Sequence, residues 1–310
     1  MAPPDPSTVR FAGTWTHRDI HANGIRFHTV EVGGAAHGAP LVVLLHGFAD
    51  FWWSWRHQLA ALSEAGYRAV AVDLRGYGDT DKPPRGYDGW TLAGDVAGLI
   101  RAMGYPKATL VGHADGGLVC WATAVLHPHL VHSIVPIGSP HPIALRQGVL
   151  RDRRQRSALM PSFVACQLPF RPERRLTRDG GAEVERIVRT RSGPDWQRSF
   201  EYDDVIAKMR TAIRIPGTAH CTLEYQRWAF RSQFRPDGRR FLNAMDKVLT
   251  LPVMQLHGAL DPFVLSGTIR RGHRYAPRQK LVSVGGAGHY AHWESPEFVN
   301  AALTEFLAAH

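Results

Sequence analysis

One short segment of the sequence has residue types and spacing that suit catalysis: residues 110–117, Leu-Val-Gly-His-Ala-Asp-Gly-Gly. An apolar strand is expected to enter a tight turn there and a helix to leave it, with glycine two places before and two places after the tip. The chain approaches itself so closely in such a turn that only small residues fit at those two positions. The turn presents its tip residue to a substrate, where a nucleophile is expected. The tip is Ala114, which carries no nucleophilic group.

Two backbone N–H groups beside this tip are predicted to form an oxyanion hole. The segment Leu45-His46-Gly47-Phe48 follows an apolar strand, and Asp115 is the first residue after the tip. The N–H groups of Phe48 and Asp115 would converge on one oxygen atom and stabilise negative charge that develops on it.

An acid and a histidine follow later in the chain, each just after an apolar strand. Asp261 follows residues 251–256, and His289 follows residues 281–284. Alone, each has an ordinary explanation, because an aspartate after a strand often caps a helix and the chain has 17 histidines. Tip, acid and histidine nevertheless occur in an order known from catalytic triads, in which the acid orients the histidine. We therefore predict that Asp261 orients His289 as a base.

The elements that must position these residues alternate along the chain. Apolar runs of strand type are separated by stretches of helical period, which predicts an α/β fold with a mostly parallel sheet covered by helices on both faces. An Asn23-Gly24 turn predicts a hairpin before them. The predicted strands are 17–21, 25–32, 41–45, 69–72, 109–111, 134–137, 251–256 and 281–284, and the predicted helices are 55–65, 92–103, 118–126 and 296–309.

The alternation stops between residues 141 and 245, where arginine-rich helical stretches are broken by prolines. This pattern predicts a helical cap, 141–245, inserted into a core formed by 1–140 and 246–310. The insertion holds 21 Lys and Arg against 11 Asp and Glu, so it accounts for the whole formal charge of +10. A solvated surface of ion pairs is the ordinary explanation, with weak contact to an anionic membrane as the alternative. No nucleic-acid recognition motif accompanies the charge, so no nucleic-acid partner is expected.

Other features of the sequence narrow the class of protein. No apolar run approaches the roughly 18 residues of a membrane span, and the first residues lack the layout of a signal peptide, so a cytoplasmic protein is expected. Three widely spaced cysteines indicate neither a disulfide framework nor a zinc site. His289 and His292 are three residues apart, as metal ligands can be, but no third ligand is evident. No cofactor motif is present, and we expect no metal and no cofactor.

Beyond the turn, the sequence resembles the epoxide hydrolase branch of the α/β-hydrolases, especially its actinobacterial members, over nearly its full length. The resemblance implies the α/β-hydrolase fold and a small apolar or lipid-like substrate between sheet and cap. In that family a carboxylate opens an epoxide, and a His–Asp pair activates the water that hydrolyses the resulting ester. Two cap tyrosines protonate the departing oxygen. The segments that carry the resemblance are 46–48 with 52–56, 73–78 with 81–83, 112–113 with 116–117, and 140–142.

The sequence departs from this family pattern at the positions of the first step. Ala114 stands where the family has aspartate, Cys166 stands where a tyrosine precedes Gln167, and Gln226 takes the place of the second tyrosine, with Tyr225 one residue off. The catalytic residues that activate water are therefore predicted to be kept, and those that attack the epoxide to be lost. Activity is then expected to be weak or altered. The predicted substrate pocket comprises His46, Trp52, His113, Cys166, Gln167, Tyr225 and Gln226.

Three explanations for Ala114 remain open at this point. Asp115 would supply the missing carboxylate if the turn were shifted by one residue. Alternatively, His289 and Asp261 act without a covalent intermediate, in a hydrolase or in a cofactor-free lyase or oxygenase. In the third explanation the chain is a ligand-binding protein without catalysis, or its nucleophile has been deliberately replaced. The loss of both cap tyrosines favours natural divergence over deliberate replacement.

Overall fold

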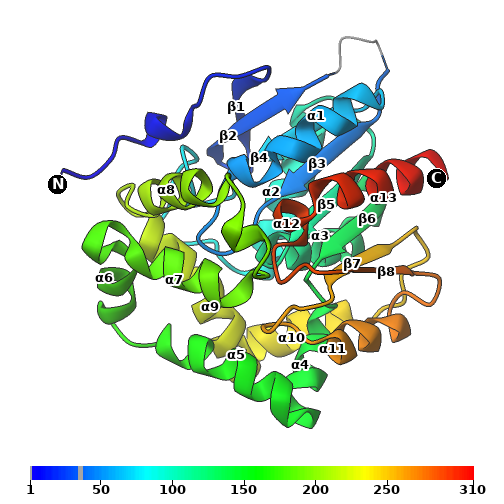
Figure 1. Cartoon of the computed structure of the whole chain (residues 1–310). Coiled ribbons are helices and arrows are strands. Elements are labelled where there is room, and N and C mark those ends of the chain that lie inside the picture. Colours follow the sequence, from blue (N-terminus) through cyan, green and yellow to red (C-terminus); the bar gives the residue numbers. More distant parts are fainter. Residues whose placement is uncertain (1, 34–37) are drawn as a thin grey trace.

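The computed structural model describes residues 2–33 and 38–310, and it is built around one eight-stranded sheet (Figure 1). The strand order is β1-β2-β4-β3-β5-β6-β7-β8. β1 and β2 form the predicted antiparallel hairpin, β2 also pairs antiparallel with β4, and all later pairs are parallel. The strands are β1 (Thr16–Ala22), β2 (Ile25–Val32), β3 (Leu41–Leu45), β4 (Arg68–Val72), β5 (Ala108–His113), β6 (Val131–Ile137), β7 (Met254–Gly258) and β8 (Lys280–Val284).

Both faces of the sheet are buried, and alternation along the central strands divides the core in two. In β3, Leu41, Val43 and Leu45 belong to one buried cluster, while Val42 and Leu44 belong to the other. Successive side chains of a strand point to opposite faces, so a strand that is apolar throughout requires cover on both sides.

Helices supply this cover (Figure 1). α1 packs against α13 on one face, and α2 packs against α3 on the other. The helices of this part of the chain are α1 (Arg56–Glu64), α2 (Gly89–Ala102), α3 (Asp115–Leu126), α11 (Ser266–Arg270), α12 (Ala291–Glu294) and α13 (Pro296–Ala308). No helix among the described residues is both long and apolar enough to cross a membrane.

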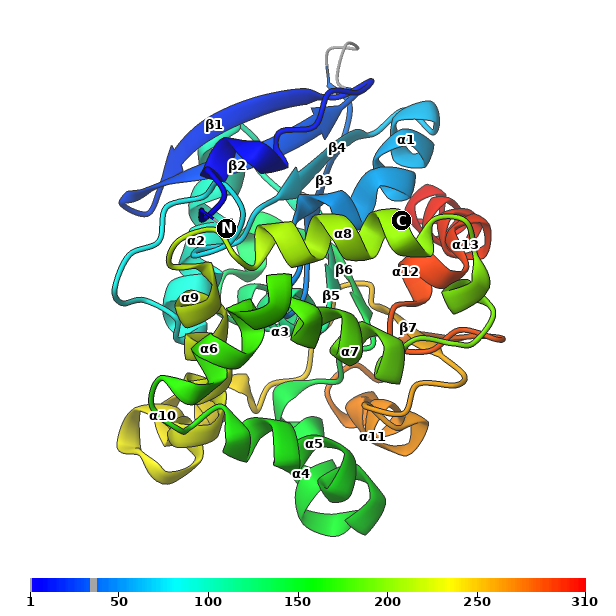
Figure 2. The ribbon, with the colours of Figure 1, turned by 60° about the vertical axis from the view of Figure 1, so that its left-hand side comes forward.

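The chain between β6 and β7 is helical, and we keep the name cap for residues 141–245. Figure 2 shows α4 to α9 gathered outside the sheet. Within this group α7 packs against α8, and α9 packs against α5 and α6. Whether the cap is a separate domain, with core segments 1–140 and 246–310, stays a prediction. Its helices are α4 (Pro142–Arg151), α5 (Arg153–Ala165), α6 (Arg171–Thr177), α7 (Ala182–Arg191), α8 (Tyr202–Ala212), α9 (Thr218–Arg231) and α10 (Pro236–Met245).

The α/β-hydrolase architecture and its predicted elements are confirmed, with differences only at their ends. α2 begins three residues early, at Gly89, because the Asp88 carboxylate accepts hydrogen bonds from the first N–H groups of that helix. β7 begins at Met254 and not at residue 251, since Pro252 has no N–H to contribute to a strand ladder.

Candidate active site

The turn between β5 and α3 has the strained geometry that the glycine spacing predicts. Ala114 at its tip adopts φ 47° and ψ −110°, and α3 begins at the next residue. A Cβ atom on Gly112 would lie 2.4 Å from the carbonyl oxygen of Gly116, and one on Gly116 would lie 2.1 Å from that of Leu45. Side chains at either position would clash with backbone, so the tip is held rigidly at the carboxyl end of the sheet.

The predicted oxyanion donors face the same cavity as Ala114. The N–H of Gly116 donates to the carbonyl oxygen of His46 at 3.1 Å, which ties the two loops together. Within the described part of the chain, the N–H groups of Phe48 and Asp115 have no protein acceptor. Both residues line the cavity, so two unused donors lie beside the tip.

His289 and Asp261 meet as predicted. The Nδ1–H of His289 donates to Asp261 Oδ2 at 2.8 Å, and Oδ1 of Asp261 accepts from the N–H groups of Phe263 and Val264 at 2.8 and 3.0 Å. Burial of Asp261 favours its neutral form, but His289 and the two N–H groups outweigh burial and hold the pKa of this carboxyl below its usual value. The pair fixes the imidazole tautomer and leaves Nε2 to the cavity as a proton acceptor.

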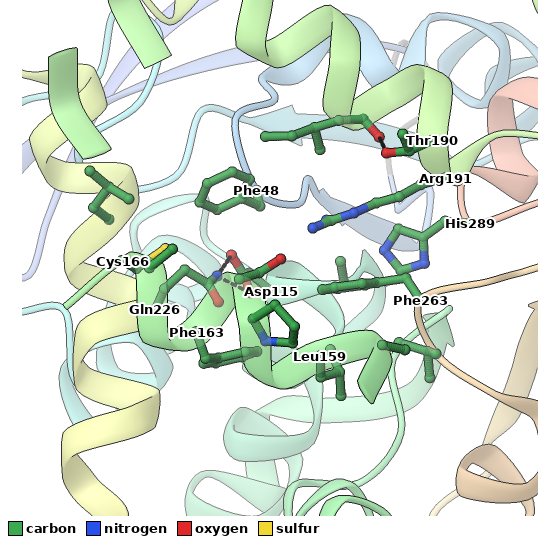
Figure 3. Close-up of a pocket in the computed structure, with 18 of the residues that line it drawn as sticks. Phe48, Asp115, Leu159, Phe163, Cys166, Thr190, Arg191, Gln226, Phe263 and His289 are labelled. Atoms are coloured by element: carbon green, nitrogen blue, oxygen red, sulfur yellow. Dashed lines mark hydrogen bonds between the residues drawn. The ribbon is translucent and has the colours of Figure 1, made fainter. Parts of the chain in front are cut away.

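Asp115 also turns its side chain into this cavity, where it contacts the cap (Figure 3). The Nε2 group of Gln226 donates to both carboxyl oxygens of Asp115, at 3.0 and 2.8 Å. Burial raises the pKa of Asp115 to about 6, although Gln226 and the more distant Arg191 oppose this increase. The site therefore holds a carboxyl group that exchanges its proton close to neutral pH.

The cavity has a volume of about 760 Å³ and lies between core and cap. Phe48, Ala114 and His289 line it from the core, and Cys166 and Gln226 line it from the cap. A second, largely apolar cavity of about 420 Å³ adjoins it. Both cavities share the residues Asp115, Leu118, Leu145, Leu159, Phe163 and Gln226.

His46 and Trp52 do not line this cavity, which corrects two pocket predictions. Both side chains are fully buried. Nε2 of His46 accepts from the N–H of Leu74 at 3.0 Å, and the indole N–H of Trp52 donates to the carbonyl oxygen of Val9 at 2.8 Å. These side chains hold neighbouring loops in place, because a residue near the tip in sequence can still face the core.

Of the remaining residues predicted for the pocket, some line the cavity and others do not. Cys166 and Gln226 line the cavity, and so does His113 from the core. Gln167 is wrongly assigned to the pocket, since its side chain bonds to the carbonyl oxygen of Phe163 and to Arg231. Tyr225 lines only the second cavity, and its hydroxyl donates to the carbonyl oxygen of Arg75 at 2.8 Å.

Glu294 is a positioning residue that the sequence did not reveal. Its carboxylate accepts from the N–H groups of Gly193 at 2.6 Å, Gly288 at 2.7 Å and Tyr290 at 3.0 Å. It thereby joins the cap segment that follows α7 to the loop that carries His289. The sequence places Glu294 just before a helix and proline, where it has the pattern of an ordinary helix start.

One group of possible metal ligands occurs among the described residues, although the sequence predicts no metal site, and this group includes His292 without His289. Side-chain atoms of Asp50, His113 and His292 lie within 4.8 Å of one another. All three residues are buried, and His113 also lines the cavity. Asp50 is already bonded to Ser54 and to its neighbour's N–H, and His113 Nε2 bonds to the carbonyl oxygen of His289 at 3.1 Å.

Comparisons with known proteins identify the family of this chain. A family model described as the alpha/beta hydrolase fold matches residues 40–296. AB hydrolase superfamily protein YfhM of Bacillus subtilis is 31% identical over 93% of this chain and 96% of its own length. Epoxide hydrolase A of Mycobacterium tuberculosis is 30% identical over 95% of this chain and 98% of its own length. The chain belongs to the epoxide hydrolase family of the α/β-hydrolases.

Solved structures of this epoxide hydrolase family match over nearly the whole chain. A mutant of the Bacillus megaterium epoxide hydrolase superposes with a TM-score of 0.82 at 26% identity, and the match covers 94% of this chain and 100% of that one. Another mutant of the same enzyme contains its product, a naphthyloxy-propane-1,2-diol. That neighbour therefore accommodates a diol with a large apolar group.

Asp115→Asn is expected to stabilise this epoxide hydrolase homologue above pH 6 by up to about 3 kcal/mol. The folded chain holds the Asp115 proton up to a pKa of about 6, whereas the ordinary value is 3.8. Folded protein therefore binds more protons between these values, and Asp115 lowers stability as pH rises through that window. Asparagine removes this cost and still accepts a hydrogen bond from Gln226.

Urea unfolding at pH 4 and pH 8 measures this effect. The stabilisation by Asp115→Asn should be large at pH 8 and should nearly vanish at pH 4. Asp246→Asn is a matched control, because Asp246 is exposed and its side chain has no hydrogen-bond partner among the described residues. An equal gain at both pH values would contradict a raised pKa at Asp115.

Proposed function

We propose that this chain hydrolyses an epoxide by direct addition of water, without an ester intermediate. The observation that carries the proposal is the content of one cavity: Ala114 offers no nucleophile, while the His289–Asp261 pair and the buried carboxyl group of Asp115 face or adjoin the same space. A base and an acid with different environments suit concerted proton transfers to and from a substrate.

His289 acts as the base in this proposal. Its Nε2 accepts a proton from water while the water oxygen bonds to an epoxide carbon. The Asp261 carboxylate, 2.8 Å from Nδ1, stabilises the imidazolium that forms. Since Asp261 is held in its charged form, the pair is able to accept a proton from water before substrate binds.

Asp115 acts as the acid. As the carbon–oxygen bond of the epoxide breaks, its electron pair stays on the oxygen, which takes the proton of the Asp115 carboxyl group. The predicted oxyanion donors, the N–H groups of Phe48 and Asp115, stabilise charge on that oxygen before the proton arrives. The product is a diol, and the proton on His289 returns to Asp115 through solvent.

The proposed substrate is a small apolar or lipid-like epoxide. The largely apolar second cavity supports this class, as does the apolar product in the neighbouring enzyme. We expect slow turnover, because the aspartate that would attack the epoxide is replaced. Loss of one member of a hydrolase triad leaves roughly 10³- to 10⁴-fold acceleration over water in a protease. A basic cap resting on an anionic membrane, and a cytoplasmic location, stay predictions.

A second mechanism has one observation in its favour. The carboxylate of Asp115 faces the cavity, so it is also placed to attack the epoxide and form an ester. Its contacts oppose this role, because Gln226 occupies both carboxyl oxygens.

A single turnover in ¹⁸O-labelled water, with enzyme in excess over styrene oxide, separates the two mechanisms. Direct addition places ¹⁸O in the first diol formed. Attack by Asp115 gives an unlabelled first diol and a labelled carboxyl group on the protein, because the ester is hydrolysed at its acyl carbon. Mass spectrometry of diol and protein measures both. Absence of diol from a panel of epoxides would overturn the proposed hydrolysis and favour a ligand-binding protein.

A further inference from the structure

Arg191 is a cavity-lining cation that the mechanism above does not use. It is the last residue of α7, and Figure 3 shows its guanidinium directed into the cavity between Phe48 and His289. Its guanidinium carbon lies 3.5 Å from the centre of the Phe263 ring. Among the described residues, no carboxylate lies within ion-pair distance of Arg191 and no acceptor bonds to its side chain.

Two other arginines that line the cavity, Arg175 and Arg186, pair with the carboxylate of Glu183. Arg171 also lines the cavity without such a partner among the described residues, but it is exposed to solvent. Arg191 is half-buried, it faces the cavity, and burial lowers its pKa. An unpaired guanidinium in this position is suited to bind an anion from outside the chain.

We propose that Arg191 binds a carboxylate group of the substrate, so that the natural substrate class is an epoxide with a carboxylate near the ring and an apolar tail. This assignment rests on the proposed function. The tail would extend past Asp115 and Gln226 into the second cavity.

The position of Arg191 sets how near the carboxylate must be to the reacting carbon. The Phe263 ring centre lies 5.3 Å from that of His289 and 3.5 Å from the Arg191 guanidinium carbon, so guanidinium and imidazole are within about 9 Å. The two residues are also joined by their backbones, since the N–H of His289 donates to the carbonyl oxygen of Arg191 at 2.8 Å. An anion on Arg191 therefore lies only a few bonds from the carbon that water attacks.

The charge balance favours a carboxylate over a phosphate. Titratable groups that interact with the charge of Arg191 are Tyr290 and Cys166 of the cavity wall and two carboxyl groups, those of Asp115 and the buried Asp261. A monoanion neutralises Arg191, while a dianion would add negative charge beside these two carboxyl groups. A carboxylate beside Asp115 also favours the protonated form that donates to the epoxide oxygen.

Binding of unreactive probes tests this assignment independently of turnover. Calorimetry compares 3-phenylpropanoate, 3-phenylpropanol and 3-phenylpropyl phosphate on the wild-type chain, on Arg191→Gln and on Arg191→Lys. We expect the carboxylate to bind at least 10-fold more tightly than the alcohol. Arg191→Gln should weaken carboxylate binding about 10- to 100-fold, and Arg191→Lys should weaken it less. Arg189→Gln, an exposed arginine of the same helix, is the control and should stay within 2-fold of the wild type.

Equal affinity for acid and alcohol, or an unchanged preference in Arg191→Gln, would overturn the assignment. Tighter binding of the phosphate would overturn the choice of a carboxylate. If Arg191→Gln does not fold, Arg191→Lys still tests the two-oxygen contact that only a guanidinium makes. Arg191-dependent binding of the acid without hydrolysis of any epoxide would refute the proposed function and the epoxide as substrate, and would leave only the carboxylate-binding site at Arg191.

Discussion

His289→Gln lowers kcat for epoxide hydrolysis by about 10³-fold, if His289 is the base that takes the proton from water. The structure supplies the reason: Nδ1 is committed to Asp261 at 2.8 Å, so Nε2 is the free acceptor facing the cavity. Glutamine keeps an N–H donor for Asp261 but has no basic nitrogen. The kinetic loss is therefore expected without the cost of leaving a buried carboxylate unpaired.

Steady-state kinetics and urea unfolding measured together distinguish loss of the base from loss of the fold. His129→Gln serves as control, because His129 is an exposed residue outside both cavities. Added imidazole should restore part of the activity of His289→Ala, where the removed ring leaves space. A kcat within 10-fold of the wild type in both His289 variants would show that another group activates the water.

The residues found from the sequence share a local signature. Ala114 lies between two glycines whose absent side chains are required by backbone contacts of 2.4 and 2.1 Å. Asp261 and His289 each directly follow a strand, and parallel strands bring their carboxyl ends to one edge. Such features depend on a few neighbouring residues and on strand order, so sequence patterns capture them.

The residues that were missed act across the boundary between cap and core. Arg191 comes from a cap helix, and its role arises only when this helix lies over Asp115 and His289. Gln226 was predicted as a pocket residue, but its bond to Asp115 was not. Nothing in the residues around Arg191 separates it from the many paired arginines of the cap. Glu294 similarly gains its three N–H partners from segments 101, 6 and 4 residues away.

His46 and Trp52 failed as pocket residues for the opposite reason. Both lie in a motif close to the oxyanion donor Phe48, and proximity in sequence suggested proximity to substrate. Side-chain direction decides the matter, and both side chains turn into the protein, where each completes a hydrogen bond to a backbone group. A local sequence pattern predicts the position of a loop better than it predicts the direction of each side chain in that loop.

Ala114→Asp is expected to raise kcat for a neutral epoxide by about 10²-fold or more, because it restores a carboxylate where the family has one. The tip already has the strained backbone, φ 47° and ψ −110°, with which such a turn presents its side chain to the cavity. A carboxylate at position 114 would also favour the protonated form of Asp115 by repulsion, and so keep a proton donor in place of the absent tyrosines. Ala114→Asn is the matched control, with the same shape and no nucleophile.

The double variant Ala114→Asp with His289→Gln identifies the chemistry behind such a gain. Without a base to activate water, the ester formed by the new carboxylate should accumulate, and the protein mass should increase by the mass of one epoxide. A gain in Ala114→Asp with no trapped ester would mean that the new carboxylate assists water addition and forms no bond to carbon. An equal gain in Ala114→Asn would exclude any role for the charge. If neither variant gains activity, a carboxylate at position 114 does not attack the epoxide in this site, and this outcome together with absence of diol from the wild-type chain would favour a ligand-binding protein.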